Sequence, residues 1–379
     1  MIYELIIIGG GMSGLSVGHF FRDQRILILE KGALLSGATG KNAGFLIGGF
    51  GEHFSRTVSR LGLARAAEIQ EIHCSNHRRI RDLTNLLAAS YHPSGSLCIG
   101  LDDREIGELR ASHDLLRQAG FDVEWMDHAE SGLRQPVGAL FNRDDAWIDP
   151  LDFWSKLAAT LPVREHTKVL NIENRGSLIE IETIHGAFQT ERIVICLDAF
   201  SADLVPELQG KYIPLRGQIL EAPMQRAKIS PPVMAQHGDI YWRIDPGKLI
   251  FGGLESSVPS EEIGIAKQPS KRIEEHQLDW IRRHLSFDAL GPPNSRCGTM
   301  AFTVDGFPFV GQLPQENRYV LSGTCGLGHS YTLEAASWLY ELIVTGVNKI
   351  PVYFSSDRIS NLPAYTDGNW RSLYEAWNY

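Results

Sequence analysis

The glycine-rich turn that follows the first apolar segment constrains the fold of this chain more than any other feature. Leu5–Ile8 is a continuous apolar run rich in β-branched residues, which predicts a strand buried on both faces. The turn Gly9–Gly14 has the sequence GGGMSG and fits the pattern GxGxxG. Residues 15–21 then predict a short helix, and residues 25–29 predict a second strand that ends at Glu30. The result is a βαβ unit of about 30 residues.

Each part of this unit has a physical role in binding a dinucleotide. Gly9 permits the tight turn, Gly11 lets the backbone approach a pyrophosphate, and Gly14 lets the helix pack closely on the strand. The pyrophosphate would lie at the helix N-terminus, where free N–H groups and the helix dipole favour negative charge. Glu30 would accept hydrogen bonds from the adenosine ribose. The nucleotide-binding residues predicted from this unit are Gly9, Gly11, Met12, Ser13, Gly14, Glu30 and Lys31.

Two further segments of small residues indicate FAD rather than NAD. Ser36–Gly44 follows shortly after Glu30, and Gly323–Ser330 leads into a predicted helix near the C-terminus. Small residues let the backbone pass close to a large flat ligand. A helix N-terminus beside the flavin would stabilise the negative charge of its reduced form. No second strand–GxGxxG–helix unit occurs in the sequence, so we expect the substrate to reduce the flavin directly and oxygen or another acceptor to receive the electrons.

The hydrophobic periodicity of the remaining sequence predicts an α/β (α+β) fold. The predicted helices are Arg56–Ala89 (one or two), Arg104–Gln118, Pro150–Leu161, Ser270–Leu285 and Leu333–Val344. The predicted strands are Ser96–Ile99, several short ones within Val163–Leu197, Tyr212–Leu220, Tyr241–Phe251 and Val320–Ser322. We expect a discontinuous Rossmann-type FAD-binding domain (1–90, 146–211 and 296–379) and a substrate domain with a mixed β-sheet (91–145 and 212–295).

Composition excludes several classes of partner. The formal net charge of −9 argues against a nucleic-acid partner. No stretch approaches the roughly 20 apolar residues of a membrane helix, and the first apolar run lacks the features of a signal peptide, so a cytoplasmic protein is expected. The five cysteines are scattered and lack CxxC spacing, which predicts reduced, mostly buried thiols and no metal site.

Several motifs together resemble the D-amino-acid oxidase superfamily, over about residues 1–345. They are GGGMSG with Glu30, SGATGKNAGF at 36–45, RGQ at 216–218, YWR at 241–243 before Gly252-Gly253, TVDGFP at 303–308 and Gly323–Gly328. The superfamily includes glycine oxidase, sarcosine oxidase and γ-glutamylputrescine oxidase-like enzymes. The resemblance implies hydride transfer from a C–H bond next to nitrogen to flavin N5, which gives an imine that water hydrolyses.

The resemblance also implies further cofactor contacts. Residues of the 36–45 segment would line the pyrophosphate and the flavin, the backbone at Val169 would meet the adenine, and the segment after Gly323 would border the pyrimidine end of the flavin. The residues so implied are Ala38, Thr39, Lys41, Asn42, Ala43, Gly44, Val169, Gly326, Gly328, His329 and Ser330.

Two departures from the family pattern concern the substrate. Met300 stands where relatives place an arginine that clamps the substrate carboxylate, and Ser330 stands where sarcosine oxidases place a lysine. We therefore predict an amine substrate, or one whose acid group is far from the reacting carbon. The alternatives are an oxidase of glycine, D-amino acids or N-methyl amino acids, with Lys41 or Arg243 as the clamp, and a flavin-binding assembly or interaction protein without turnover. Cys297 lies one residue from the position of covalent flavin attachment in some relatives, so non-covalent FAD is expected.

Three residues are the catalytic candidates. Tyr241 would stack on the substrate or cover the flavin, while its strand neighbour Trp242 would point the opposite way. Arg243 would bind an acidic substrate group or form a surface ion pair. His329 would act as a base or lie against the flavin edge, and we favour the second because hydride transfer requires only a neutral amine.

Four other polar residues have less specific predictions. His53 is expected to be solvent-exposed in a loop. His73 and His77 have the i, i+4 spacing of metal ligands but lack a third ligand in sequence, so an ordinary surface helix is expected. Asp198 stands where relatives carry Gly or Asn, and the sequence suggests no role for it. The aromatic tail with Trp370, Tyr374 and Trp377 is expected to pack on its own domain.

Overall fold

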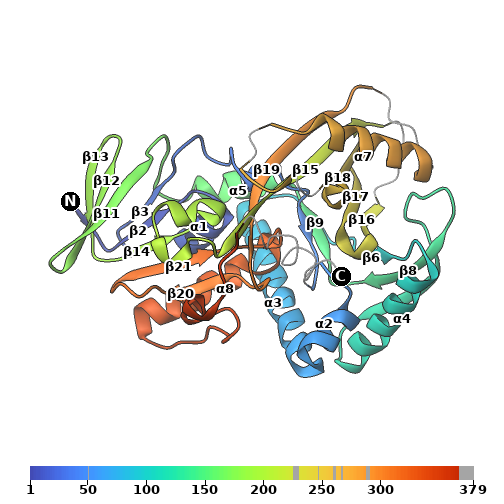
Figure 1. Ribbon diagram of the computed structural model, residues 1–379, viewed down its shortest axis with the longest axis horizontal. Helices are drawn as coiled ribbons and strands as arrows, with labels where there is room; N and C mark the ends of the chain where they lie inside the picture. The colour runs from blue at the N-terminus through green and yellow to red at the C-terminus, as the bar shows by residue number, and fades with distance from the viewer. Residues whose placement is uncertain are drawn as a thin grey trace.

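A computed structural model describes residues 1–49, 51–224, 230–245, 247–258, 262–265, 268–286 and 291–366. Two large β-sheets, each covered by helices, organise the molecule (Figure 1). The structure confirms the mixed α/β fold class predicted from sequence. Within the described residues, no helix is both long enough and apolar enough to cross a membrane.

The first sheet has six strands and contains the predicted βαβ unit. Its order is β10-β3-β2-β14-β21-β20, with β10 at Val163–Arg164, β3 at Ile26–Leu29, β2 at Leu5–Ile8, β14 at Ile193–Ile195, β21 at Arg318–Ser322 and β20 at Phe309–Gln312. All neighbouring strands pair in parallel except β20 with β21. The four residues of β2 are each at most 2% exposed, as predicted for a strand covered on both faces.

Helices pack in a layer against this sheet. Of these, α1 (Met12–Phe20) and α8 (Gly328–Thr345) contact its strands, while α3 (Leu63–Leu87) packs on α8 and α5 (Pro150–Ala158) packs on α1. Two smaller sheets adjoin: β1-β13-β12-β11 and β4-β9-β5. Their strands are β1 (Ile2–Tyr3), β11 (Val169–Arg175), β12 (Leu178–Thr183), β13 (Gly186–Thr190), β4 (Phe45–Leu46), β5 (Tyr91–His92) and β9 (Ala146–Ile148).

The second large sheet has eight strands in the order β19-β15-β18-β17-β16-β6-β8-β7. Their bounds are β19 Asn294–Thr303, β15 Tyr212–Pro223, β18 Lys248–Gly253, β17 Ile240–Asp245, β16 Ser230–Ala235, β6 Ser96–Ile99, β8 Val137–Asn142 and β7 Val123–Ala129. Helix α7 (Lys271–His284) packs against β15 and β18, and α4 (Asp103–Gln118) packs against β7 and β8 (Figure 1). The strands of this sheet come mainly from the segments predicted for the substrate domain; the division into two domains remains our proposal.

The structure confirms one uncertain element and corrects another. The segment 56–89, predicted as one or two helices, forms α2 (Phe54–Leu61) and α3, separated at Gly62 with φ +80°. The prediction of one long strand over 241–251 is wrong, because β17 and β18 form an antiparallel hairpin there. Gly247 lies between them at φ +83°, and the sequence Pro246-Gly247 is a turn signal that the apolar pattern concealed. The aromatic tail at 370–377 lies outside the described residues.

Candidate active site

The turn between β2 and α1 needs glycine at two of the predicted positions. Gly9 has φ +112°, and a Cβ atom there would lie 2.3 Å from the carbonyl oxygen of Cys196. A Cβ atom on Gly14 would lie 1.9 Å from the carbonyl oxygen of Gly9. The start of α1 can therefore approach the end of β2 this closely only without a side chain at position 14, and the turn at Gly9 leaves no room for a side chain beside Cys196.

The N-terminus of α1 is suited to an anion. Its N-cap residue Gly11 provides no side-chain cap, and its first turn holds no acidic residue. The N–H of Met12 donates to Oγ1 of Thr39 at 2.9 Å, which holds the 38–41 turn (η1, Ala38–Lys41) beside the helix end. The other N–H groups of the first turn and the helix dipole fit the diphosphate of a dinucleotide.

Glu30 lies at the end of β3, beside this turn. Its carboxylate accepts the N–H of Gly10 at 2.8 Å and the N–H of Gly32 at 2.9 Å. A carboxylate has about four acceptor positions, so this arrangement leaves capacity for ribose hydroxyls. The ammonium of Lys31 lies 3.3 Å from the ring centroid of Phe200. Val169 begins β11. Two residues before it, the N–H of Thr167 donates to the Glu30 carbonyl at 2.8 Å.

A cavity of about 300 Å³ opens where η1 and the N-termini of α1 and α8 meet the eight-stranded sheet. The predicted cofactor residues that line it are Met12, Ala38, Lys41, Asn42, Ala43, Gly44, Gly326, Gly328, His329 and Ser330. The predicted residues that do not line it are Gly9, Gly11, Ser13, Gly14, Glu30, Lys31, Thr39 and Val169, which belong to the α1 turn, η1 and the ends of β3 and β11. The structure thus brings three sequence segments, far apart in the chain, to one cavity.

The sheet side of the cavity is formed by alternate residues of β15 and β19. Gly298, Met300 and Phe302 of β19 line it, and Leu215, Gly217 and Ile219 of β15 line it from the neighbouring strand. Cys297 is not among the lining residues and is 3% exposed. Since successive side chains of a strand point to opposite faces, its thiol points away from the cavity. All five cysteines are free, as predicted.

Tyr241 lies in the cavity wall, and its neighbour Trp242 does not. The Trp242 side chain is fully buried on the other face of the sheet and donates its indole N–H to the carbonyl of Ser131 at 2.8 Å. The Tyr241 ring packs edge-on against Phe45 with 5.6 Å between centroids, and burial raises the pKa of its hydroxyl well above the usual range. The sequence prediction that at most one of the pair reaches the cavity is confirmed.

Arg243 does not line the cavity, and the predicted surface ion pair is wrong because its side chain is 2% exposed. Its Nε donates to the carbonyl of Ala43 at 2.7 Å, its Nη1 pairs with Asp245, and its guanidinium lies 3.9 Å from the ring centroid of Trp147. These contacts use the guanidinium to hold the 42–44 backbone. We therefore assign Arg243 a structural role in place of substrate binding.

His329 is buried at the cavity wall. Its Nε2 accepts the indole N–H of Trp154 at 2.8 Å, and the two rings are nearly parallel at 6°. Burial lowers its pKa to about 4, so the ring is neutral at pH 7. Nε2 is thus already used as an acceptor, and that His329 lies against the flavin edge, the alternative favoured from the sequence, stays a prediction. Next to it, Ser330 Oγ donates to the carbonyl of Ile47 at 2.9 Å.

Four carboxylates from the described part of the chain line the cavity, and of these only Asp198 was noted from the sequence. Glu255, on the short helix η5 (Glu255–Ser257), is 9% exposed, and burial raises its pKa to about 8. Burial also raises the pKa of Asp239, whose Oδ2 accepts the hydroxyl of Ser256 at 2.6 Å. Glu52 and Asp198 complete this acidic set. Among the described lining residues there is no arginine, and the lysine is Lys41. The feature of the sequence that could have indicated Glu255 is its position, two residues after Gly252-Gly253.

Asp198, for which the sequence suggested no role, organises the turn before α8. Its Oδ1 accepts the N–H groups of Gly323 and Thr324, each at 3.0 Å, and its Oδ2 accepts the N–H of Ala301 at 2.9 Å. Its backbone is left-handed, with φ +48°. The residue thus joins η2 (Asp198–Asp203), β19 and the glycine-rich segment that leads into α8.

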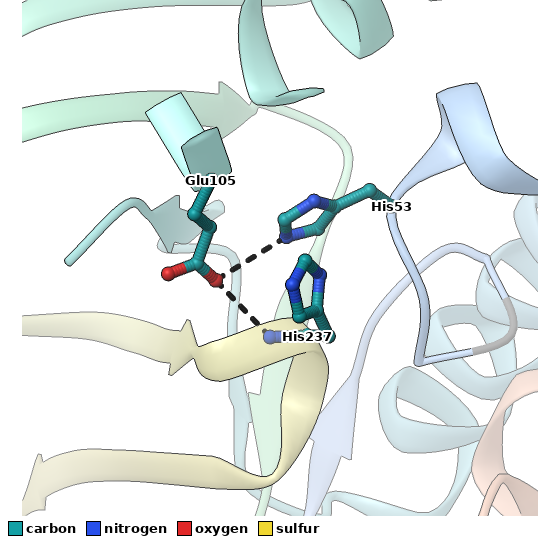
Figure 2. A group of neighbouring side chains, drawn as sticks. All are labelled: His53, Glu105 and His237. Atoms are coloured by element: carbon teal, nitrogen blue, oxygen red, sulfur yellow. Dashed lines mark hydrogen bonds and ion pairs between the residues drawn. The ribbon is translucent and has the colours of Figure 1, made fainter. Parts of the chain in front are cut away.

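His53, Glu105 and His237 form a second polar cluster (Figure 2), and His237 also lines the cavity. His53 is 8% exposed, so the expectation of a solvent-exposed loop is wrong. Its Nε2 lies 3.4 Å from Oε1 of Glu105, and the same oxygen accepts the backbone N–H of His237 at 3.1 Å. Arg56 donates to Glu108 at 2.8 Å and lies 3.1 Å from His237 Nε2. A guanidinium at that distance opposes binding of a metal cation. The cluster instead holds the turn 236–238, in which all three residues have positive φ.

The predicted surface helix at 73–77 is also corrected. His73 is 0% exposed and His77 is 4% exposed, because α3 is covered by α8 and the adjoining loops. Burial lowers the pKa of each imidazole to about 3. His73 Nδ1 accepts the N–H of Gly49 at 2.8 Å. Among the described residues neither ring nitrogen of His77 has a hydrogen-bond partner, and its Nδ1 lies 3.8 Å from Oδ1 of Asp145.

Comparison with known proteins identifies the family. The family model of DAO, FAD dependent oxidoreductases, matches residues 4–342, and the chain belongs to this family. Glycine oxidase from Geobacillus kaustophilus (strain HTA426) is 22% identical over 337 residues, which cover 83% of this chain and 85% of the relative. Gamma-glutamylputrescine oxidoreductase from Escherichia coli (strain K12) is 20% identical over 398 residues, covering 98% of this chain and 89% of the relative.

Solved structures show the same fold. The crystal structure of glycine oxidase from Geobacillus kaustophilus superimposes with a TM-score of 0.76 at 21% identity, covering 93% of this chain and 98% of that one. L-proline dehydrogenase from P. horikoshii gives a TM-score of 0.75 at 19% identity, covering 95% and 98%. The chain is therefore an FAD-dependent oxidoreductase with the fold of the amino-acid oxidases, and the sequence resemblance to this superfamily is confirmed.

Proposed function

We propose that this protein oxidises the C–N bond of an amine whose reacting end carries no carboxylate. The observation that carries the proposal is the set of carboxyl groups in the cavity wall: Glu255, Asp239 and Glu52 line it, while arginine is absent from its described lining. A buried carboxylate on the substrate would meet these acids without a bidentate partner, which is costly. An ammonium group would instead offset their charge.

The residues around the cavity fit non-covalent FAD. The α1 N-terminus and Glu30 would hold the diphosphate and ribose, and the segments 38–44 and 326–330 would surround the flavin ring. The thiol of Cys297 lies on the opposite face of β19, which supports non-covalent binding. When bound, flavin supplies an acceptor for a hydride from the carbon next to nitrogen. Tyr241, Met300 and Phe302 would orient that carbon and keep water out while the C–H bond breaks. Water would hydrolyse the resulting imine afterwards.

A second candidate is oxidation of a small amino acid. Lys41 favours it, because its side chain lines the cavity and could pair with a carboxylate. Arg243, the other cation considered from sequence, is used by Asp245 and Ala43.

Anaerobic mixing of the yellow holoenzyme with panels of amines and amino acids tests these proposals. We expect bleaching of the flavin band by primary or secondary amines and not by glycine, sarcosine or D-alanine. Bleaching by amino acids alone would refute the amine proposal, and loss of that bleaching in Lys41→Met would then identify the clamp. Retained FAD with no reduction by any panel member would favour a flavoprotein without turnover. Release of the colour by acid precipitation tests non-covalent binding.

A further inference from the structure

Within the described residues, Glu255 is a buried carboxylate without a cationic partner. It follows Leu254, whose backbone is left-handed with φ +70°, and this turn directs residue 255 back over the sheet toward the cavity. Its Oε1 accepts the N–H of Gln218 on β15 at 2.9 Å. In the part of the chain that the structure describes, no arginine, lysine or histidine pairs with it, and its Oε2 accepts no side-chain hydrogen bond.

The groups that face Glu255 make its negative charge unfavourable. Burial has the largest effect, and Asp239 from the turn before β17 and Glu262 from the segment 262–265 act in the same direction. Arg216 lies on β15 nearby but donates Nε to Glu262 at 2.7 Å and pairs with it through Nη2. Tyr241 on β17 is uncharged at neutral pH. These effects together raise the pKa of Glu255 to about 8.

Asp239 lines the same cavity but is already bonded. Its Oδ2 accepts the hydroxyl of Ser256 at 2.6 Å and its Oδ1 accepts the N–H of that residue at 3.4 Å. Glu52 is likewise held, by the hydroxyl of Thr57 at 3.0 Å and by an ion pair with Arg60. Glu255 is therefore the lining carboxylate best able to accept a hydrogen bond from a ligand.

We propose that Glu255 receives the ammonium group of the substrate and accepts one of its protons before the C–H bond breaks. This inference rests on the proposed amine substrate. The proton passes from R–CH₂–NH₃⁺ to the ionised carboxylate, which gives the neutral amine and the carboxylic acid. Loss of that proton frees the nitrogen lone pair to form the C=N bond of the iminium as the C–H bond breaks, and bound oxidised flavin would supply the acceptor for the hydride.

A base is required because an ammonium nitrogen has no lone pair to donate as the hydride leaves. In water an alkylammonium with a pKa near 10 would hold its proton against a carboxylate with a pKa near 4. In a cavity with apolar walls, desolvation disfavours both charged forms and moves the two pKa values toward each other. Ile219, Met234 and Phe302 provide such walls here.

Binding of a cation whose charge does not titrate tests the first half of the proposal. Tetramethylammonium would bind the ionised form of Glu255, so the holoenzyme should release close to one proton per site at pH 7, where a carboxyl of pKa about 8 is about nine-tenths protonated. Calorimetry in buffers of different ionisation enthalpy measures this release. At pH 9.5 the release should approach zero, and between pH 6 and 7.5 the affinity should rise about tenfold per pH unit.

Variants at the two carboxylates separate the specific role from the general charge of the cavity. Glu255→Gln should abolish the proton release and flatten the pH dependence of affinity, whereas Asp239→Asn should keep the release. Glu255→Asp should also keep the proton release, which would show that the site tolerates substitution. Binding of tetramethylammonium without proton release, no binding at all, or a release that persists in Glu255→Gln would overturn the inference.

Flavin reduction by a reactive amine tests the proton transfer. In the wild-type holoenzyme the ratio of reduction rate to Kd should break near pH 8. In Glu255→Gln the break should disappear, and the ratio should rise about tenfold per unit up to the pKa of the amine itself. An unchanged break would refute the base role while leaving the amine activity in place. Reduction by no amine at all would refute the proposed function and the base role together.

Discussion

Removal of the Asp198 carboxylate tests whether this residue holds the segment before α8. In Asp198→Ala the N–H groups of Ala301, Gly323 and Thr324 lose their acceptor. An unsatisfied buried donor costs about 1–3 kcal/mol, which gives roughly 3–9 kcal/mol for three. Removing a buried carboxylate recovers part of its desolvation cost, so we expect a net loss of about 3–5 kcal/mol.

The change in melting temperature follows from the size of the chain. An unfolding entropy of about 2.1 cal/mol/K per residue corresponds to roughly 0.8 kcal/mol per degree for 379 residues. The midpoint of Asp198→Ala should therefore fall by about 4–6 °C. Because Gly323–Thr324 lead directly to the cavity residues Gly326 and Gly328, the same variant should release flavin at a lower temperature than the wild type.

Two further variants provide a smaller expected loss of stability and an exposed control. Asp198→Asn keeps one oxygen for Gly323 and Thr324 and tolerates the left-handed backbone, but it turns an amide toward the Ala301 N–H, so about 1–3 kcal/mol should be lost. Asp203→Asn changes an exposed carboxylate of the same short helix and serves as the control. Thermal unfolding followed by tryptophan and flavin fluorescence gives both readouts. A midpoint of Asp198→Ala within 1 °C of the control would refute the reasoning.

Three shorter predictions concern other parts of the structure. Gly14→Ala should yield colourless protein, because its Cβ would lie 1.9 Å from the Gly9 carbonyl oxygen, whereas Gly37→Ala, with open space around its Cβ, should stay yellow; equal flavin absorbance would contradict this. Burial keeps His77 neutral, with a pKa of about 3 in the folded state against 6.5 in the unfolded state. Below pH 6.5 the unfolded state binds a proton that the folded state does not, so the free energy of unfolding falls, by about 2 kcal/mol at pH 5. His77→Leu should narrow the stability difference between pH 7.5 and pH 5 by that amount in denaturant titrations, and the exposed control His185→Leu should not. Trp154→Phe leaves Nε2 of His329 without its donor and should lower stability by about 1–3 kcal/mol, a result that an unchanged unfolding midpoint would exclude.

The sequence alone determined the parts of this protein that depend on short-range geometry. Gly14 is required by its distance to the Gly9 carbonyl within one βαβ unit, and Gly9 has the positive φ of the tight turn, so the spacing of the two glycines was sufficient to predict the strand, the turn and the helix. Period-two alternation also separated Tyr241 from Trp242 correctly. Over 241–251 the apolar pattern predicted one strand where the structure has two, because the strands on both sides of the turn signal Pro246-Gly247 are buried.

Only the tertiary structure decided which charges share the cavity and which are hidden elsewhere. Arg243 and His53 look like surface residues in a sequence, yet both are buried by elements far along the chain. Glu255 is an ordinary acid until β15, β17 and the turn before β17 enclose it and place Asp239 beside it. Burial and the neighbours of a charge are long-range properties, set by how the sheets pack rather than by the residues next to it in the chain.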